Sequence, residues 1–484
     1  MIQQQLMTLV GLARQRVTLL PLALSALGLG CVEAQPETSP EFDRVVLVTI
    51  DTLRADHLQT YGYARQTSPF IDRLAENGVV FERAISTMSH TAPSHASMFT
   101  GLLPLGHRVL KNGDLLSKDI HTFVQSFGAA GYKTGAFVSN GFLGRSTNDF
   151  QVLNGWLRKG EETVDQAIAW IESLEPAQPF FMWVHFFDVH EAELEGMAAP
   201  QKYYEANASR TALPPDQFYS HLAKRHGLAD PMPEEEFAPI RWEPRLKIRS
   251  NWLESRAEVI DRVDDYDALI AYVDDQIERL YVAVESFAPL SPSLWVIASD
   301  HGEALGDHGY RGHGAYIYQE QLHVPLIIHS SDESIDAGRF ESQVSLVDLH
   351  PTLLDVLGSG ASSSDGFSLW PALRASSSSR QNRAVFAQKK QMVSLKNCVF
   401  TMIDGDFKYI YHSVREDELY DLASDPGELV NLIDSPAAEA YRTRLLAKLE
   451  EYPWEDLMNG SIKTEELPDE IHDELEALGY MGDE

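Results

Sequence analysis

Two sequence patterns typical of buried β-strands end at side chains that can bind a metal ion. The run RVVLVTID (44–51) ends at Asp51, and the run SLWVIASD (293–300) ends at Asp300, which His301 follows. Ligands of open α/β sheets bind beyond the carboxyl ends of the strands, so we expect these three side chains to face one crevice. Mixed oxygen and imidazole ligation suits Zn²⁺ or Mn²⁺ better than Ca²⁺, which prefers oxygen atoms alone. The alternative is that the carboxylates cap helices or pair with basic side chains.

Thr91 supplies a hydroxyl that could act as a nucleophile. The stretch HTAPSHASMF (90–99) places it at or beside the N-cap of a helix that closes at Thr100 and Gly101, with Pro93 in the first turn. A hydroxyl there faces unpaired backbone N–H groups and the positive end of the helix dipole, which favour an anion. A metal ion touching the same oxygen would lower its pKa and orient it for attack. Capping alone is the other role open to Thr91.

Strands that alternate with helices must position these groups. Buried strands are expected at 44–51, 179–188 and 293–300, helices at 68–78 and 266–284, and a helix, a turn and a strand within 122–139. This alternation predicts an α/β fold in which a large mixed, mostly parallel β-sheet is sandwiched by helices.

The chain also shows signs of division into parts. A catalytic domain is expected over 44–373, with an aperiodic, proline-containing insertion at about 192–258. Serine-rich segments at 359–364 and 375–379 bracket a boundary, after which short strands and a helix near the C-terminus predict a smaller α+β domain over 384–484.

Ten stretches, in this order, resemble the sulfatase family of the alkaline phosphatase superfamily. The resemblance covers about residues 44–432 and returns near 467–480. The stretches are VVLVTIDTLRADHL, TSPFIDRLAENGVVFERA, TAPSHASMFTG, GYKTGAF, FFDVH, YDALIAYVDDQI, SDHGEALGDHG, HVPLIIH, DGFSLWPAL and ELYDLASDPGELVNL.

The resemblance implies a role for each matching position of the metal motif. Asp51, Thr91, Asp300 and His301 correspond to ligands of one divalent metal ion, and Thr91 occupies the position of the nucleophile. A second ion, held by Asp188, His190 and His313, is a less favoured alternative.

Five further positions are assigned to the substrate side of the same site. His190 and His313 would contact the ester oxygens or protonate the leaving group, as an imidazole can near neutral pH. The residues assigned to substrate binding are His95, Ser139 and His308. Of these, His308 would support the residues that contact the substrate. For each of His190, His308 and His313, a hydrogen-bonded structural histidine is the alternative.

The departures from the family pattern concern the mechanism. Sulfatases carry Cys or Ser followed by x-Pro-Ser-Arg and oxidise the first residue to formylglycine, whereas here Thr91 opens the motif and His95 replaces the arginine. The methyl group of Thr91 rules out the same aldehyde, so no formylglycine is expected. The second Asp of the first metal motif is Thr52, and Ser139 and Gly141 replace the usual Lys and His. Unmodified threonine resembles the nucleophile of superfamily relatives that cleave or transfer phosphoryl groups, so sulfate and phosphate esters both stay open.

Composition excludes one class of partner. The chain has 39 Lys and Arg against 72 Asp and Glu, a net charge of −33. Nucleic acid demands a basic surface, so no nucleic-acid partner is expected.

The N-terminus predicts export. Arg14 and Arg16 precede the apolar run VTLLPLALSALGLG, which is about 21 Å long as a helix and too short for a bilayer core of about 30 Å. Such a run typifies a signal peptide. LGLGC resembles a lipoprotein box, which would attach a lipid to Cys31, and cleavage after Ala34 is the alternative. Residues 1–34 are therefore expected to direct an extracytoplasmic location, either lipoprotein-anchored or periplasmic or secreted.

Three functions fit these residues. The first is a metal-dependent hydrolase of small-molecule or glycan sulfate or phosphate esters. The second is a phospho- or sulfo-transferase to a glycan or lipid acceptor. The third is a catalytically silent glycan-binding homologue, which the missing Lys, His and Arg would allow.

Overall fold

The structure of the chain is a computed structural model that describes residues 41–140, 143, 149–155, 157–176, 178–190, 198–210, 256–309, 311–360, 363–374, 383–389 and 398–452. The predicted signal segment 1–34, Gly141, most of the predicted insertion and the helix predicted within 467–480 lie outside these residues. In the described part of the chain, no helix combines the length and the apolar character needed to cross a bilayer.

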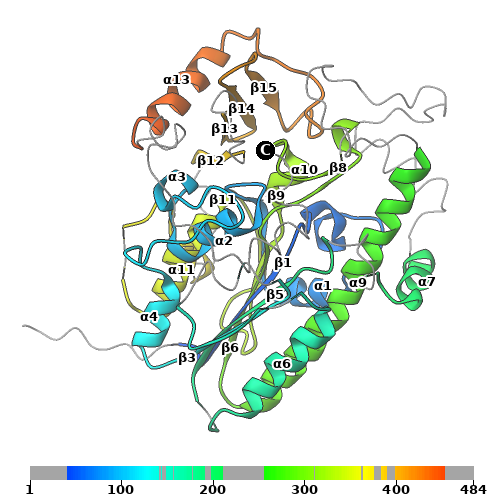
Figure 1. Cartoon of the computed structure of the whole chain (residues 1–484), viewed down its shortest axis with the longest axis vertical. Coiled ribbons are helices and arrows are strands. Elements are labelled where there is room, and N and C mark those ends of the chain that lie inside the picture. The colour runs from blue at the N-terminus through cyan, green and yellow to red at the C-terminus, as the bar shows by residue number, and fades with distance from the viewer. Residues whose placement is uncertain are drawn as a thin grey trace, which may run out of the picture. The chain divides into compact units, whose positions relative to one another are not determined.

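A nine-stranded sheet forms the centre of the fold (Figure 1). Only β10 and β9 run antiparallel to their neighbours in the described pairings. The predicted mixed, mostly parallel sheet is thereby confirmed. In spatial order the strands are β11 (Gly338–Ser345), β2 (Val79–Ile85), β10 (Leu326–Ser330), β6 (Ser293–Ser299), β1 (Arg44–Ile50), β5 (Phe180–Phe186), β3 (Lys133–Val138) and β4 (Val152–Gly155), and β9 (His323–Val324) pairs with β2.

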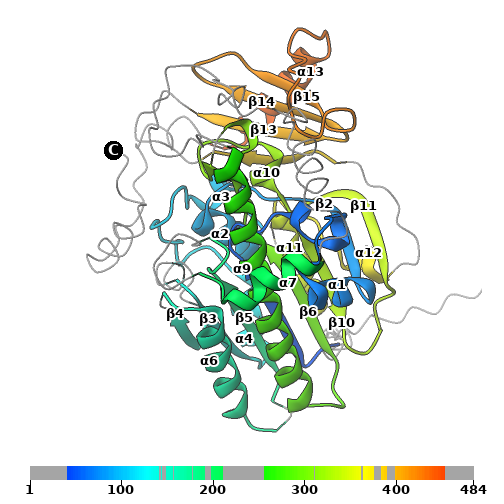
Figure 2. The same ribbon diagram turned by 90° about the vertical axis from the view of Figure 1, so that its right-hand side faces the viewer.

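Helices cover both faces of this sheet, as predicted. One face packs against α2 (Thr91–Thr100), α4 (Phe123–Ala129) and α11 (Leu349–Val356). The other packs against α1 (Pro69–Glu76), α6 (Gly160–Glu172) and α9 (Arg256–Phe287), and α6 and α9 run side by side in Figures 1 and 2. Every residue of β1, β5 and β6 is buried, because alternate side chains point to opposite apolar layers.

Shorter elements connect these layers. They are η1 (Ala55–His57), η2 (Gln59–Tyr61), α3 (Pro104–His107), α7 (Gln201–Arg210), β7 (Ala304–Leu305), η4 (Asp307–Gly309), β8 (Arg311–Gly312), α10 (Gln319–Leu322), η5 (Leu346–Asp348) and α12 (Trp370–Arg374).

The stretch predicted to be aperiodic contains helical structure at both ends. α7 lies within it, and α9 begins ten residues before the predicted helix start at 266. Tyr203 of α7 donates a hydrogen bond to Asp275 of α9 at 2.8 Å and packs edge-on against Tyr272. These tertiary contacts stabilise a helix whose own sequence has no strong apolar periodicity.

A second, smaller sheet follows in the chain. It is antiparallel and contains β12 (Val385–Gln388), β13 (Val399–Asp404), β14 (Phe407–His412) and β15 (Glu418–Asp421), in that order. α13 (Ala438–Leu449) packs its apolar side chains against this sheet. The predicted C-terminal α+β unit is thus present, while the predicted boundaries at 373 and 384 stay a prediction.

Candidate functional site

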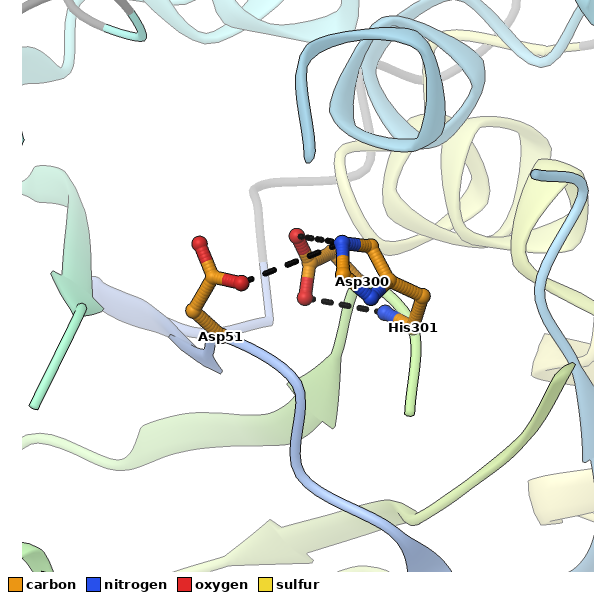
Figure 3. Close-up of side chains that lie close together, drawn as sticks. All are labelled: Asp51, Asp300 and His301. Atoms are coloured by element: carbon orange, nitrogen blue, oxygen red, sulfur yellow. Dashed lines mark hydrogen bonds and ion pairs between the residues drawn. The ribbon is translucent and has the colours of Figure 1, made fainter. Parts of the chain in front are cut away.

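Asp51, Asp300 and His301 converge where β1 and β6 end (Figure 3). Each of them offers a ligand atom, and these atoms all lie within 4.8 Å of one another. His301 Nε2 is 3.5 Å from Asp300 Oδ2 and 3.8 Å from Asp51 Oδ1. β1 and β6 are adjacent parallel strands with Ile50 paired to Ser299, which is why the residues that follow them meet.

The hydrogen bonds of these three residues leave His301 Nε2 and Asp300 Oδ2 available as ligand atoms. His301 Nδ1 lies 3.0 Å from the Gly302 carbonyl, so it carries the proton and Nε2 keeps its lone pair for the carboxylate side. Asp300 Oδ1 accepts from the backbone N–H groups of His301 and Thr52, while its buried Oδ2 accepts no hydrogen bond from the residues that the structure describes. This donor set fits a divalent cation with mixed oxygen and nitrogen ligation.

The charge of Asp300 depends on its neighbours. Burial raises the pKa of Asp300, but the imidazoles of His301, His95 and His185 lower it and outweigh burial. An ionised Asp300 next to Asp51 concentrates negative charge in a buried position. A cation would offset the repulsion between the two carboxylates.

The Thr91 hydroxyl points toward the same group. Thr91 Oγ1 lies 3.4 Å from His301 Nε2. α2 begins at Thr91, its N-cap is His90, and no side chain makes a capping hydrogen bond there. α2 is held in place by Ser94, whose hydroxyl donates to the Asp300 carbonyl at 2.7 Å. The residues predicted as metal ligands are therefore together, and Thr91 is not used as a cap.

The first turn of α2 offers fewer free N–H groups than the sequence suggested. The Ala92 N–H donates to Asn112 Oδ1 at 2.9 Å, Pro93 has no N–H, and the Ser94 N–H donates to the His90 carbonyl at 3.1 Å. The expectation that unpaired N–H groups of this turn surround Thr91 is therefore corrected, because a side chain twenty residues away takes one of them.

One further imidazole, that of His313, lies beside His301, and two more lie beside His313. The His313 ring is 4.6 Å from that of His301, 4.8 Å from that of His190 and 5.7 Å from that of His90, measured between centroids. His190 also stacks on Phe187 at 4.5 Å. The structure thus places the predicted His313 next to His301 and the predicted His190 next to His313, and it adds His90.

The position of His90 requires a glycine opposite it. Gly314 has a φ of 83°, and a Cβ added there would lie 2.0 Å from His90 Cε1. Burial lowers the pKa of His313 to about 3, although Glu303 counters the shift, so the His313 ring is neutral at pH 7. Glu303 itself bonds Arg262 at 2.9 Å.

The residues predicted to bind substrate contact other parts of the protein. His95 Nδ1 donates to the Thr91 carbonyl at 2.8 Å, and the Ser139 hydroxyl bonds that of Thr163 at 2.8 Å. His308 stacks on Tyr318 with ring centroids 3.9 Å apart. Their predicted substrate contacts stay predictions.

Asp188, the carboxylate of the less favoured second metal site, binds the start of a helix. Its Oδ1 accepts from the Gly160 N–H at 2.9 Å, where α6 begins. Burial raises the pKa of Asp188 to about 7. Its described contact is that of a helix cap.

His308 is expected to make stability depend on pH. It bonds Glu320 at 3.3 Å and the Glu428 carbonyl at 3.4 Å, and Glu320 raises its pKa to about 9 against the opposing effect of burial. A raised folded-state pKa gives stabilisation that is complete below about pH 6.5 and is lost as the pH rises through 9, about 3 kcal/mol in all. Urea unfolding of His308→Gln should lose this pH dependence.

The exposed His121 provides the matched control for that measurement. The substitution His121→Gln should leave the pH dependence between 6.5 and 9 as in the unchanged chain. An equal slope in the unchanged chain and in His308→Gln would show that the His308–Glu320 pair does not stabilise the fold.

Sequence reasoning missed a polar group behind the carboxylates. His185 Nε2 lies 3.3 Å from Asp51 Oδ2, and its Nδ1 lies 3.0 Å from Thr49 Oγ1. Burial lowers the pKa of His185 to about 4 and that of His95 to about 3, although Asp300 opposes both shifts. A signal was available, because Thr49 and His185 are polar residues near the ends of otherwise apolar strand patterns.

Comparison with known proteins gives a consistent family match. Residues 43–359 match the sulfatase family, and residues 306–454 match a family described as N-sulphoglucosamine sulphohydrolase, C-terminal. The first match covers more than half of the chain.

Individual relatives are similar over nearly their full length. The multifunctional alkaline phosphatase superfamily protein PehA of Trinickia caryophylli is 24% identical, over 82% of this chain and 92% of its own. The N-acetylglucosamine-6-O-sulfatase of Bacteroides thetaiotaomicron is 25% identical, over 96% of this chain and 93% of its own. The crystal structure of the phosphonate monoester hydrolase of Agrobacterium radiobacter covers 84% of this chain and 95% of its own, with a TM-score of 0.66 and 21% identity.

Proposed function

The chain belongs to the sulfatase family, and from this premise we propose that it is an exported, metal-dependent hydrolase of sulfate or phosphate esters that uses unmodified Thr91 as its nucleophile. The observation that carries the proposal is the 3.4 Å approach of Thr91 Oγ1 to His301 Nε2, next to Asp51 and Asp300. A hydroxyl aimed at a group of metal-ligating side chains is the arrangement that nucleophilic catalysis requires.

Asp51, Asp300 and His301 would hold the cation, with Thr91 beside it. When bound, a divalent cation lowers the pKa of a neighbouring hydroxyl and stabilises negative charge on the ester oxygens. Thr91 Oγ1 attacks the sulfur or phosphorus atom in line with the departing alcohol, and its proton passes to water. The bond to the alcohol breaks, and a covalent threonine ester remains.

The imidazoles of His313 and His190 act on the leaving-group side of the ester. The His313 ring lies beside that of His301, and the His190 ring lies beside that of His313. Either ring can hydrogen-bond to an ester oxygen. Because His313 is neutral at pH 7, His190 is the residue that passes a proton to the leaving alcohol. Water then attacks the sulfur or phosphorus atom of the threonine ester, the bond to Thr91 Oγ1 breaks, sulfate or phosphate leaves, and a proton of the water restores the Thr91 hydroxyl.

Two relatives are named for two different kinds of ester, so we leave the class of ester open. One relative is named for a sugar sulfate, N-acetylglucosamine-6-O-sulfatase, and one similar structure is that of a phosphonate monoester hydrolase. Both substrates present a tetrahedral centre with anionic oxygens. We therefore assign this chain the shared chemistry, attack on such a centre.

Metal analysis combined with paired turnover assays tests the proposal. The purified full chain should contain about one equivalent of a divalent cation, with Zn²⁺ or Mn²⁺ favoured over Ca²⁺. It should hydrolyse at least one of an aryl sulfate, an aryl phosphate monoester and an aryl phosphodiester, and chelation should abolish that turnover. The activity should be found outside the cytoplasm in cells that make the full chain.

Two results would replace the proposal. Product that forms only with an added glycan or lipid acceptor would indicate a transferase. Tight glycan binding by metal-free protein, without turnover of any of the esters, would indicate a silent binding homologue.

A further inference from the structure

One hydroxyl lies at the centre of the polar group behind the two carboxylates. Thr49 Oγ1 accepts a hydrogen bond from Trp183 Nε1 at 2.8 Å and lies 3.0 Å from both His185 Nδ1 and His95 Nε2. A hydroxyl has one proton and two lone pairs, so three contacts saturate it. Thr49 is fully buried, and replacing its oxygen with a methyl group would leave all three partners without this bond.

The contact of His95 with the Thr91 carbonyl decides which groups donate and which accept in the hydrogen bonds of the Thr49 hydroxyl. A carbonyl only accepts, so His95 Nδ1 carries a proton where it meets that carbonyl at 2.8 Å. In the neutral ring, Nε2 then accepts from the Thr49 hydroxyl. Trp183 and His185 are left as the donors to the same oxygen. One hydroxyl therefore orients both imidazoles.

Each of these imidazoles lies beside one of the carboxylates. His185 Nε2 lies 3.3 Å from Asp51 Oδ2, and His95 Nδ1 lies 3.8 Å from Asp300 Oδ2. The Thr49 hydroxyl is thus one side chain away from both carboxylates that would bind the cation. Through His95 it also reaches the first residue of α2, Thr91.

The sheet explains why these groups meet. Val45 and Leu47 face α2 whereas Val46 and Val48 face the opposite layer, so alternation directs Thr49 toward α2 as well. Thr49 pairs with His185 on β5 and with Ala298 on β6.

We propose that Thr49 is a positioning residue of the cation site: its hydroxyl fixes the orientation of the His95 and His185 rings, which pack beside Asp300 and Asp51, and so sets the arrangement of the carboxylates that binds the divalent cation. This inference rests on the proposed function, because it assumes that the site binds a cation. Groups that orient metal ligands typically change metal affinity 10–100-fold when they are removed.

Calorimetric titration of the metal-free full chain with Mn²⁺ and with Zn²⁺ tests the inference. Thr49→Val keeps the branched shape but removes the hydroxyl, and it should weaken cation binding about 10–100-fold. Thr49→Ser restores the hydroxyl and should bind within about 3-fold of the unchanged chain. Thermal unfolding of each variant reports whether the fold is retained.

Thr134 offers a matched control on the same sheet. It is buried on β3, and its hydroxyl accepts from the Gln151 N–H at 3.0 Å. Thr134→Val should lower stability as any lost buried hydrogen bond does, without weakening cation binding. A merely structural role for Thr49 would make the two valine variants behave alike.

The outcomes separate this inference from the proposed function. Cation affinity in Thr49→Val equal to that of the unchanged chain overturns the role of Thr49. If Thr49→Val does not fold, His185→Asn replaces it, since asparagine lacks the ring that packs beside Asp51, and unweakened binding there overturns the inference equally. An unchanged chain that binds neither cation overturns the proposed function instead.

Discussion

Thr91→Ala is expected to lower kcat for the preferred ester at least about 10³-fold, because it removes the attacking oxygen. The fold should persist, since the Thr91 hydroxyl makes no capping hydrogen bond and alanine is a good helix former at this position. Cation content should also persist, because Asp51, Asp300 and His301 are unchanged. Steady-state kinetics with a sulfate and a phosphate ester, together with metal analysis and circular dichroism, check these expectations.

Thr91→Ser provides the matched comparison for the alanine variant. Serine keeps the hydroxyl and loses only the methyl group that restricts χ1, so kcat should stay within about tenfold of the unchanged chain. If Thr91→Ala turned over both esters at near-normal rates, Thr91 would not be the nucleophile and the mechanism would fail at its first step.

Asp300→Asn is expected to remove most bound cation and, with it, turnover. The asparagine oxygen can still accept from the His301 and Thr52 N–H groups as Asp300 Oδ1 does, so the substitution changes the side of the carboxylate that faces Asp51. An amide N–H₂ there cannot act as a ligand, and the buried site loses one negative charge. We expect cation affinity to fall about 100-fold or more, measured by metal content and by titration of the metal-free protein.

Asp188→Asn is the matched control for Asp300→Asn, because it removes a buried carboxylate that is not expected to bind the cation. Asp188 is equally buried, and its described hydrogen bond is to the Gly160 N–H. This variant should keep its cation. Stoichiometric, tightly held metal in Asp300→Asn would remove Asp300 from the ligand set and leave the site without its central carboxylate.

Local patterns in the sequence were sufficient for the framework of the site. The apolar runs before Asp51 and Asp300 predicted two buried strands, and parallel strands present their carboxyl ends at one edge, so the convergence of these residues followed from topology. The helix from Thr91 to Thr100 was also predictable from local signals, and its C-cap Gly101 has a φ of 70°. The resemblance to the sulfatase family added the expected neighbours His190 and His313.

Tertiary structure decided what surrounds those residues. Strand register pairs Thr49 with His185, and the packing of α2 brings His95 onto the same hydroxyl, neither of which spacing along the chain reveals. Asn112 takes an N–H of the first turn of α2 that the sequence left unpaired. The periodicity of apolar residues in the sequence predicts which face of a helix or strand is buried, because this face depends only on residues that are close together along the chain. Hydrogen bonds between distant side chains depend on register and on packing, which arise only when the layers assemble.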